Sequence, residues 1–182
     1  MGLDSVELII AFEKYFKINI PDREAEKMYR ISDVVRYLNT VYATAPISKP
    51  VSGLLQNKFT DFLNLVPEAP VFERYRIEDK IFWEQVATGT NLAIVLPKGR
   101  VPNTLNRLQR LFYLKPDYEV AQITYSRFLE VIAYVNYKAL IEPGKWNSIE
   151  ALTIVVCGIT IELNDLDPYE VYPSSGFVDD RH

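Results

Sequence analysis

The residues best suited to chemistry stand at the start of the chain, where Asp4 and Ser5 open an amphipathic stretch that runs to Phe16. A hydroxyl at a helix N-terminus suits a phosphodiester, because the anion meets free backbone N–H groups and the positive end of the helix dipole. Asp4 followed three residues later by Glu7 also fits a helix start, with an acceptor for those N–H groups and negative charge in the first turn. The pattern favours either a phosphate ester on Ser5 or a simple helix cap.

Other reactive side chains are few. The one histidine, His182, is the last residue, and a catalytic imidazole needs a fixed position. Cys157 lies in the apolar run TIVVCGITIEL, which predicts a packed, inert thiol. The sequence has no glycine-rich phosphate loop, no nucleophile elbow and no histidine pair at metal-ligand spacing. We therefore expect neither a metal site nor an enzyme.

Composition narrows the class of protein further. The 182 residues carry a net charge of −4, which argues against a nucleic-acid partner. The longest apolar run, residues 152–161, is shorter than the roughly 18 residues of a membrane span. A single cysteine excludes an internal disulfide, and the acidic, amphipathic first residues do not resemble a signal peptide. These features predict a cytoplasmic protein without a membrane partner.

Hydrophobic periodicity predicts a mainly all-α fold. Residues 71–76 alternate and could instead be a short strand or an extended segment. A strand also competes with a helix over 147–163, because of the β-branched residues and Gly158 in that stretch. Composition makes residues 43–50 a linker. The expected helices cover residues 4–16, 31–38, 54–65, 79–89, 123–141 and 147–163, with a short helical turn at 21–26.

The first 40 residues resemble an acyl carrier protein from its second helix onward, over LDSVELIIAFEKYFKINIPDREAEKMYRISDVVRYL. In that family an Asp-Ser-Leu motif begins the second helix, and its serine carries a 4′-phosphopantetheine arm. The resemblance therefore implies Ser5 as the attachment site, with Asp4 beside it. It also implies a role in fatty acid or polyketide biosynthesis, with a phosphopantetheinyl transferase and acyl-handling enzymes as partners.

The family's missing first helix and loop resemble the other end of the chain, WNSIEALTIVVCGITIELNDLDPYEVYPSSGFVDDRH. We therefore expect a circularly permuted carrier domain, a four-helix bundle built from residues 1–44 and 146–182 around an inserted, mostly helical domain at 45–145. The alternative is that the tail is simply another helix and loop. Charge favours the permutation, because residues 1–40 and 146–182 carry −1 and −6, whereas the residues between them carry +3.

The inserted region at 45–145 contains a pattern similar to one in the first 40 residues. A helix followed by Ile94-Val95-Leu96-Pro97 and then by Ile123-Thr124, which opens another helix, matches the order around Ile18-Asn19-Ile20-Pro21 and Ile31-Ser32. This order suggests a degenerate second carrier copy. No Asp-Ser pair opens the corresponding helix, so such a copy would carry no arm.

The position of the arm depends on the alignment. Ser5 lies eleven residues before Phe16, whereas the family has about fourteen, a difference close to one helical turn. An alignment without a gap instead matches Leu3-Asp4-Ser5-Val6-Glu7-Leu8 to a common family sequence one turn inside the helix. The arm would then fall at Gly2, which has no hydroxyl.

Two functions follow from these alignments. The first is a carrier that presents a thioester-bound acyl group on its arm and has no catalysis of its own. The alternative is a non-catalytic interaction module that keeps the carrier fold without the arm. If the tail of one chain completes the bundle of another, a swapped homo-oligomer results.

Overall fold

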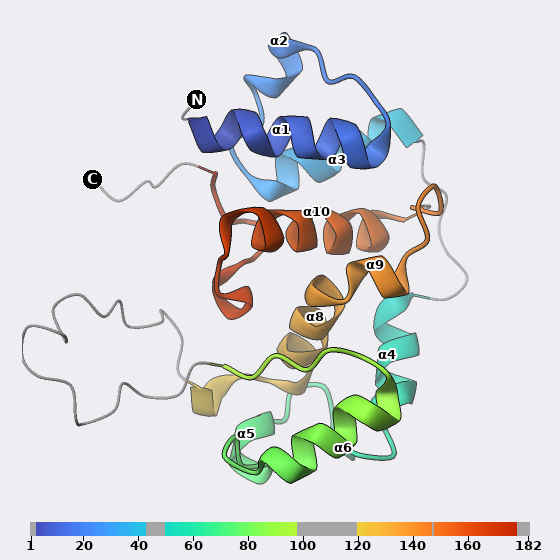
Figure 1. The fold of residues 1–182 in the computed structure, drawn as a ribbon, viewed down its shortest axis with the longest axis vertical. Helices are drawn as coiled ribbons and strands as arrows, with labels where there is room; N and C mark the ends of the chain where they lie inside the picture. Colours follow the sequence, from blue (N-terminus) through green and yellow to red (C-terminus); the bar gives the residue numbers. More distant parts are fainter. Residues whose placement is uncertain (1–2, 43–49, 98–119, 147, 178–182) are drawn as a thin grey trace, which may run out of the picture.

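The computed structural model describes residues 3–42, 50–97, 120–146 and 148–177, which fold into helices joined by loops (Figure 1). Within these residues there is no extended strand, only two isolated β-bridges. The prediction of a mainly all-α fold is therefore confirmed. The elements are α1 (Leu3–Phe16), α2 (Asp22–Ala25), α3 (Ile31–Tyr42), α4 (Val51–Phe59), α5 (Val71–Arg74), α6 (Lys80–Thr90), η1 (Val120–Gln122), α8 (Tyr125–Val135), α9 (Tyr137–Leu140), α10 (Ile149–Asn164) and η2 (Pro168–Glu170).

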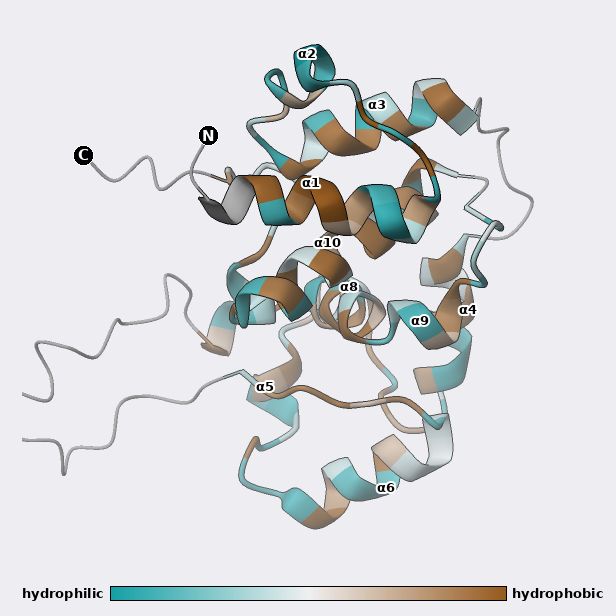
Figure 2. Ribbon diagram, turned by 45° about the horizontal axis from the view of Figure 1, so that its top comes forward, coloured by the Kyte–Doolittle hydropathy of each residue, from teal (hydrophilic) through white to brown (hydrophobic). Residues whose placement is uncertain are grey.

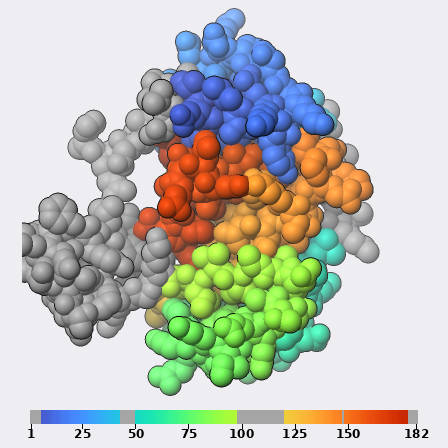
Figure 3. All heavy atoms as spheres, in the orientation of Figure 1, coloured from blue at the N-terminus to red at the C-terminus, as the bar shows by residue number. Residues whose placement is uncertain are grey.

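Helix α10 is the centre of the molecule. It packs against α1 and α3 on one side and against α8 and α9 on the other, so the helices form successive layers (Figures 1 and 3). Every residue from Ala151 to Ile161 is buried except Thr153, which is partly buried. A helix covered on all sides needs no polar face, which explains the nearly continuous apolar run. The helix prediction for residues 147–163 is confirmed and the competing strand is wrong.

Gly158 lies where α10 packs closely against α8 and α9. A Cβ atom there would meet Cδ1 of Tyr137 at 2.3 Å and the carbonyl oxygen of Tyr134 at 2.6 Å. The glycine that weakens helix propensity in the sequence is thus what allows α10 to approach α8 and α9 so closely.

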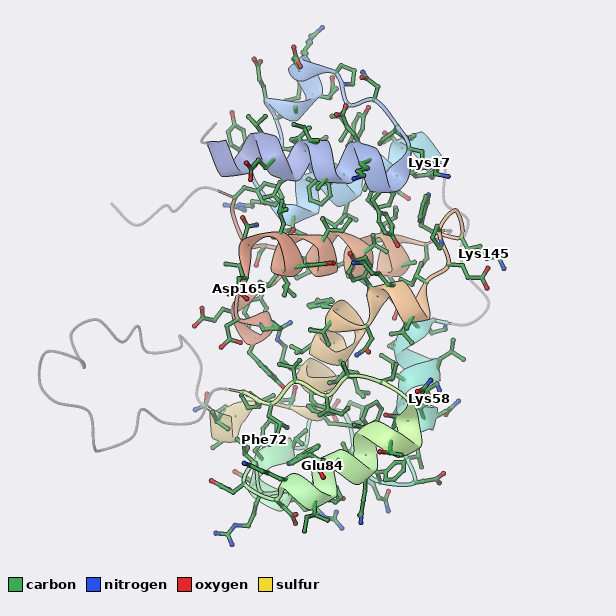
Figure 4. All side chains as sticks on the ribbon, viewed as in Figure 1. Lys17, Lys58, Phe72, Glu84, Lys145 and Asp165 are labelled. Atoms are coloured by element: carbon green, nitrogen blue, oxygen red, sulfur yellow. The ribbon has the colours of Figure 1, made fainter. Side chains whose placement is uncertain are left out.

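The first three helices follow the predicted order. Leu8, Phe12 and Phe16 form the buried side of α1, while α2 is mostly hydrophilic (Figure 2). Lys17 ends α1 with a positive φ of 53°, and Asp165 ends α10 with a φ of 49° (Figure 4). Both helices therefore stop at a left-handed residue.

The middle of the chain departs from the prediction in three places. Residues 71–74 form the helical turn α5 instead of a strand, because the Tyr75 amide donates back to the Val71 carbonyl at 3.0 Å. Helix α4 begins at Val51 and ends at Phe59, and so covers only part of the predicted 54–65. The single helix expected over 123–141 is broken at Asn136, whose side chain bonds both backbone groups of Ala93 at 2.8 Å.

Polar side chains tie the middle helices to α10 and its following loop. The Glu150 carboxylate of α10 accepts hydrogen bonds from the Val51 and Ser52 amides at 2.8 Å and so caps α4. Arg127 of α8 lies 3.9 Å over the Tyr172 ring, and its guanidinium donates to three carbonyls of the same loop: Pro168, Tyr169 and Val171.

Candidate functional site

The candidate site is the first turn of α1. The helix begins at Leu3, so Asp4 and Ser5 both lie within this turn. Amide groups in a first helical turn have no acceptor within the helix and form its positive end. The backbone at Ser5 therefore has the polarity that a phosphate ester needs. Gly2, the arm position in the alternative alignment, lies outside the described residues.

The surface that continues from this turn along α1 is both apolar and charged. Val6 and Ile10 are 44% and 56% exposed, and Glu7, Lys14 and Lys17 are exposed with them. In the space-filling view α1 lies at one end of the molecule and its side chains reach the surface (Figure 3). A partner protein could therefore contact α1 without displacing another helix.

The C-terminal segment reaches the same part of the molecule. The Phe177 ring lies 6.3 Å from the Phe12 ring of α1, and the Phe177 amide donates to the Tyr29 carbonyl at 2.9 Å. The segment leading to Phe177 runs from η2 towards the N-terminal half of α1 (Figure 1). Residues that are far apart in sequence thus lie together beside the middle of α1 and the start of α3.

The other reactive groups in the described residues do not form a site. Cys157 is fully buried, and burial raises the pKa of its thiol to about 12, so it is protonated and a poor nucleophile at neutral pH. The prediction of a packed core cysteine is confirmed. No cluster of three metal-ligating side chains occurs in the part of the chain that the structure describes, and His182 lies outside that part.

A cavity of about 360 Å³ opens between α4, α8 and α10. Leu55, Leu129 and Ile154 are among its apolar lining residues, and Glu130 and Glu150 are among the polar ones. None of its lining residues belongs to α1, so it is separate from the candidate site.

Three residues that organise the fold were not singled out by sequence reasoning: Arg127, Asn136 and Glu150. Their partners are 41 to 99 residues away in the chain, so no local spacing could indicate the contacts. The only local signal was the charge of Glu150 in the first turn of an expected helix, which suggests a role at its own helix start rather than at that of α4.

The fold and the site together define a class of protein. It is a small helical bundle with a hydroxyl-bearing residue in the first turn of a helix whose outer face is exposed. Among curated proteins, the acyl carrier protein of Akkermansia muciniphila is 54% identical over 40 residues, which are 22% of this chain and 50% of that protein. That of Wolinella succinogenes is 58% identical over 39 residues, 21% of this chain and 51% of that protein. The Campylobacter fetus protein is 57% identical over 38 residues, with 21% and 49% covered.

These relatives confirm the resemblance to acyl carrier proteins over about 40 residues. The chain spans about half the length of the curated relatives it matches. No family model and no solved structure matches it. None of the described helices is both long and apolar enough to cross a membrane.

Proposed function

We propose that α10, α1, α2 and α3, with the loop at 165–177, form an acyl carrier-like unit, here called the outer unit. It presents a thioester-bound acyl group on a 4′-phosphopantetheine arm attached to Ser5 and has no catalysis of its own. The observation that carries this proposal is the place of Ser5 in the first turn of an exposed helix, in a chain that is similar to acyl carrier proteins.

The arm attaches through a phosphodiester, so its anion benefits from the free amides and the dipole of α1. Asp4 precedes Ser5 as in the family's motif. The exposed Val6 and Ile10 continue from the attachment point along α1 and supply an apolar surface for enzymes that load or use the arm.

The outer unit is a permuted carrier domain in this proposal. Packing supports the assignment, because α10 contacts both α1 and α3 as a first helix of a bundle would, and Phe177 covers Phe12. Residues 1–44 and 146–182 then form one domain, and residues 45–145 are an insertion.

A reordered chain tests the permutation: residues 50–182 followed directly by residues 1–42. Joining these ends puts seven residues between Phe177 and Leu3. The reordered protein should keep the helical circular-dichroism signal and unfold within about 3 °C of the original, a difference of about 1 kcal/mol. A reordered chain that does not fold, next to a backbone-cyclised chain that also does not fold, would contradict the permutation.

The partners that this function requires are a phosphopantetheinyl transferase and acyl-handling enzymes of fatty acid or polyketide biosynthesis in the cytoplasm. The seven acidic residues of 146–182 favour partners with a basic surface. If α10 of one chain instead covers α1 and α3 of another, a swapped dimer forms, and sedimentation equilibrium would measure twice the 21.0 kDa chain mass.

The proposal is tested by incubating the protein with coenzyme A and a broad-specificity phosphopantetheinyl transferase and measuring its intact mass. We expect a gain of one arm that Ser5→Ala abolishes. Ser32→Ala, which removes another hydroxyl at a helix start, should leave the gain unchanged. No gain, or a gain that persists in Ser5→Ala, would contradict the Ser5 assignment.

The alternative function is an interaction module that keeps this fold without an arm. It is favoured by the alignment without a gap, which moves the arm position to Gly2. The apolar surface formed by Val6 and Ile10 would then be its docking surface. A folded protein that gains no arm, but whose binding to a carrier-recognising enzyme weakens in Ile10→Asp, would identify this function.

A further inference from the structure

Two backbone pairings in the molecule have the same hydrogen-bond pattern. Both are antiparallel, and both join the residues at the start of a helix to a segment elsewhere in the chain. The outer pairing consists of Phe177 N–H to Tyr29 O (2.9 Å), Ile31 N–H to Ser175 O (3.1 Å), Ser32 N–H to Pro173 O (2.8 Å) and the bridge between Arg30 and Gly176. The middle pairing consists of Val71 N–H to Ile123 O (3.0 Å), Tyr125 N–H to Ala69 O (2.8 Å), Ser126 N–H to Pro67 O (2.9 Å) and the bridge between Pro70 and Thr124.

The correspondence keeps one register throughout. Tyr29 to Ser32 map onto Ile123 to Ser126 with a constant offset of 94, and Pro173 to Phe177 map onto Pro67 to Val71 with a constant offset of 106. Three hydrogen bonds and one bridge agree without a gap on either segment. Amphipathicity alone would not produce this agreement, because it constrains side chains and not backbone pairing.

Burial follows the same register along α3 and α8. The paired side chains have nearly equal exposed fractions: Ile31 and Tyr125 at 1% each, Val34 and Phe128 at 0% each, Val35 and Leu129 at 6% and 7%, and Leu38 and Ile132 at 0% each. In the loops, Tyr169 and Leu63 correspond with the offset of 106, and both are 1% exposed. The two helices therefore turn the same positions inwards.

The helix contacts repeat as well. Helix α10 packs against α3 and α1, and α4 packs against α8 and α6. Helix α10 ends nine residues before Pro173, and α4 ends eight residues before Pro67. In Figure 1 the two sets lie at opposite ends of the molecule, and α10 and α8 meet between them.

We infer that residues 50–97 and 120–135, here called the middle unit, are a second carrier-like unit in which α4, α6 and α8 take the places of α10, α1 and α3. The chain order of this unit is continuous, with α4 first, whereas α10 follows the rest of the outer unit. Eight residues separate Val71 from Lys80, close to the seven that separate Phe177 from Leu3 in the reordered chain. Residues 98–119, which separate this part of the middle unit from η1 and α8, lie outside the described residues.

The middle unit is silent as a carrier, which means that it has no residue at the arm position to which an arm could be attached. The backbone gives an offset of 74 between α1 and α6, because Lys17 and Asn91 follow these helices with φ of 53° and 55°, and Ile18 N–H to Glu13 O corresponds to Leu92 N–H to Ala87 O. This offset places Asp79 at the position of Ser5 and Arg76 at that of Gly2. Neither of these two side chains, a carboxylate and a guanidinium, has a hydroxyl for a phosphodiester. The protein therefore has two carrier-like units and one position for an arm. The silence rests on the proposed function, whereas the duplication of the fold does not.

Amide hydrogen exchange followed by NMR tests the duplication. The amides of Ile31, Ser32, Tyr125 and Ser126 lie in first helical turns, where no intrahelical acceptor protects them. If both pairings form, all four should exchange at least about tenfold more slowly than the unstructured chain, as should Phe177 and Val71. Protection of one pairing with free exchange at the other would overturn the inference.

Intact mass tests the silence separately. After complete transferase treatment, we expect Ser5→Ala to carry no arm. An arm that persists in Ser5→Ala and maps to the middle unit would overturn the silence while leaving the duplication intact. If neither the original chain nor Ser5→Ala gains an arm, the proposed function fails, the middle unit is still unloaded, and the exchange experiment alone decides the duplication.

Discussion

The outer and middle units share helix packing and backbone pairing but differ in how the chain reaches that arrangement. In the outer unit the paired segments of Ser32 and Pro173 are 141 residues apart, whereas Ser126 and Pro67 in the middle unit are 59 apart. The same backbone geometry thus forms from a chain that leaves the unit and returns, and from one that stays within it. Packing rather than chain order defines the unit.

The two units also differ in chemistry. The outer unit contains Ser5 and most of the acidic excess, while the region between carries +3. The middle unit contains an aromatic core in which Phe59, Trp83 and Phe128 are in contact, with ring centroids 5.7 Å apart in the pairs Phe59–Phe128 and Trp83–Phe128. The same backbone pairing thus surrounds an aromatic core in the middle unit and the helix that contains Ser5 in the outer unit.

The largest expected effect comes from the equivalent core residues Leu38 and Ile132, both 0% exposed. Leu38→Ala and Ile132→Ala should each lower the free energy of unfolding by about 3 kcal/mol, because each leaves a cavity in a closed core. Since α10 packs against both α3 and α8, both variants should shift one common urea transition. The control is Leu54→Ala, at a half-exposed position, which should change the free energy of unfolding by less than about 0.5 kcal/mol.

One common transition would show that the two units share one cooperative core. Two separate transitions, with Leu38→Ala moving only one of them, would show that the two units are independent domains.

The second effect concerns the contact between the units. Gly158→Ala should cost about 2 kcal/mol, because the new Cβ atom would meet the Tyr134 carbonyl oxygen at 2.6 Å, and the backbone cannot move aside cheaply. Gly53→Ala is the matched control in α4, where the nearest atom to the new Cβ is Pro50 Cγ at 3.7 Å. It should raise the thermal midpoint, since alanine favours a helix by up to about 1 kcal/mol over glycine. Equal responses of the two variants would show that α10 and α8 do not approach so closely.

A smaller loss is expected from Glu150→Ala. This change removes both acceptors for the Val51 and Ser52 amides and should cost about 1 kcal/mol, as for other helix caps. The measurement is the midpoint of thermal unfolding, with Glu84→Ala on the exposed face of α6 as the control (Figure 4). An unchanged midpoint in Glu150→Ala would mean that α4 is not capped from α10.

The smallest effect depends on pH. Hydrogen bonds from Lys138 and Tyr137 lower the pKa of the Glu162 carboxyl below its usual range. The stability that this carboxylate contributes is present above its unfolded pKa and is lost as the pH falls through the lower folded pKa. Because Glu162 and Lys138 are both exposed by more than half, the loss should be below about 1 kcal/mol. Thermal midpoints measured between pH 6 and pH 3 should fall less in Glu162→Gln than in the original protein, and parallel curves would contradict this.

Local signals predicted the helix starts well. The helices predicted from residues 79, 123 and 147 have Asp79, Thr124 and Ser148 as their caps, each within one residue of the predicted start, and each of these side chains accepts a hydrogen bond from the amide three residues later. Such capping depends only on neighbouring residues, so the sequence contains the information.

Long-range contacts could not be predicted in the same way. The break at Asn136 depends on Ala93, 43 residues away, and the early start of α4 depends on Glu150. The echo of the first half in the middle was visible in the sequence, but it matched Ile123 to Ile31. The backbone pairing instead matches Tyr125 to Ile31, because hydrogen bonds and not similar letters fix the register.

The candidate site was predictable in part. Its position at the start of an amphipathic helix followed from the pattern around Ser5. The relatives confirm that about 40 residues of the chain resemble acyl carrier proteins. The resemblance predicted that residues 146–182 lie beside the first helix, but no local pattern could indicate the particular contact between Phe177 and Phe12.

The central claim, that Ser5 carries the arm, is tested most directly by locating the modification after transferase treatment. Trypsin should release residues 1–14, because Lys14 is the first lysine or arginine, and Ser5 is the only hydroxyl-bearing residue in that peptide. We predict that mass spectrometry finds the arm on this peptide and fragments it to Ser5. A protein that remains unmodified, or an arm found on any other peptide, would contradict the account.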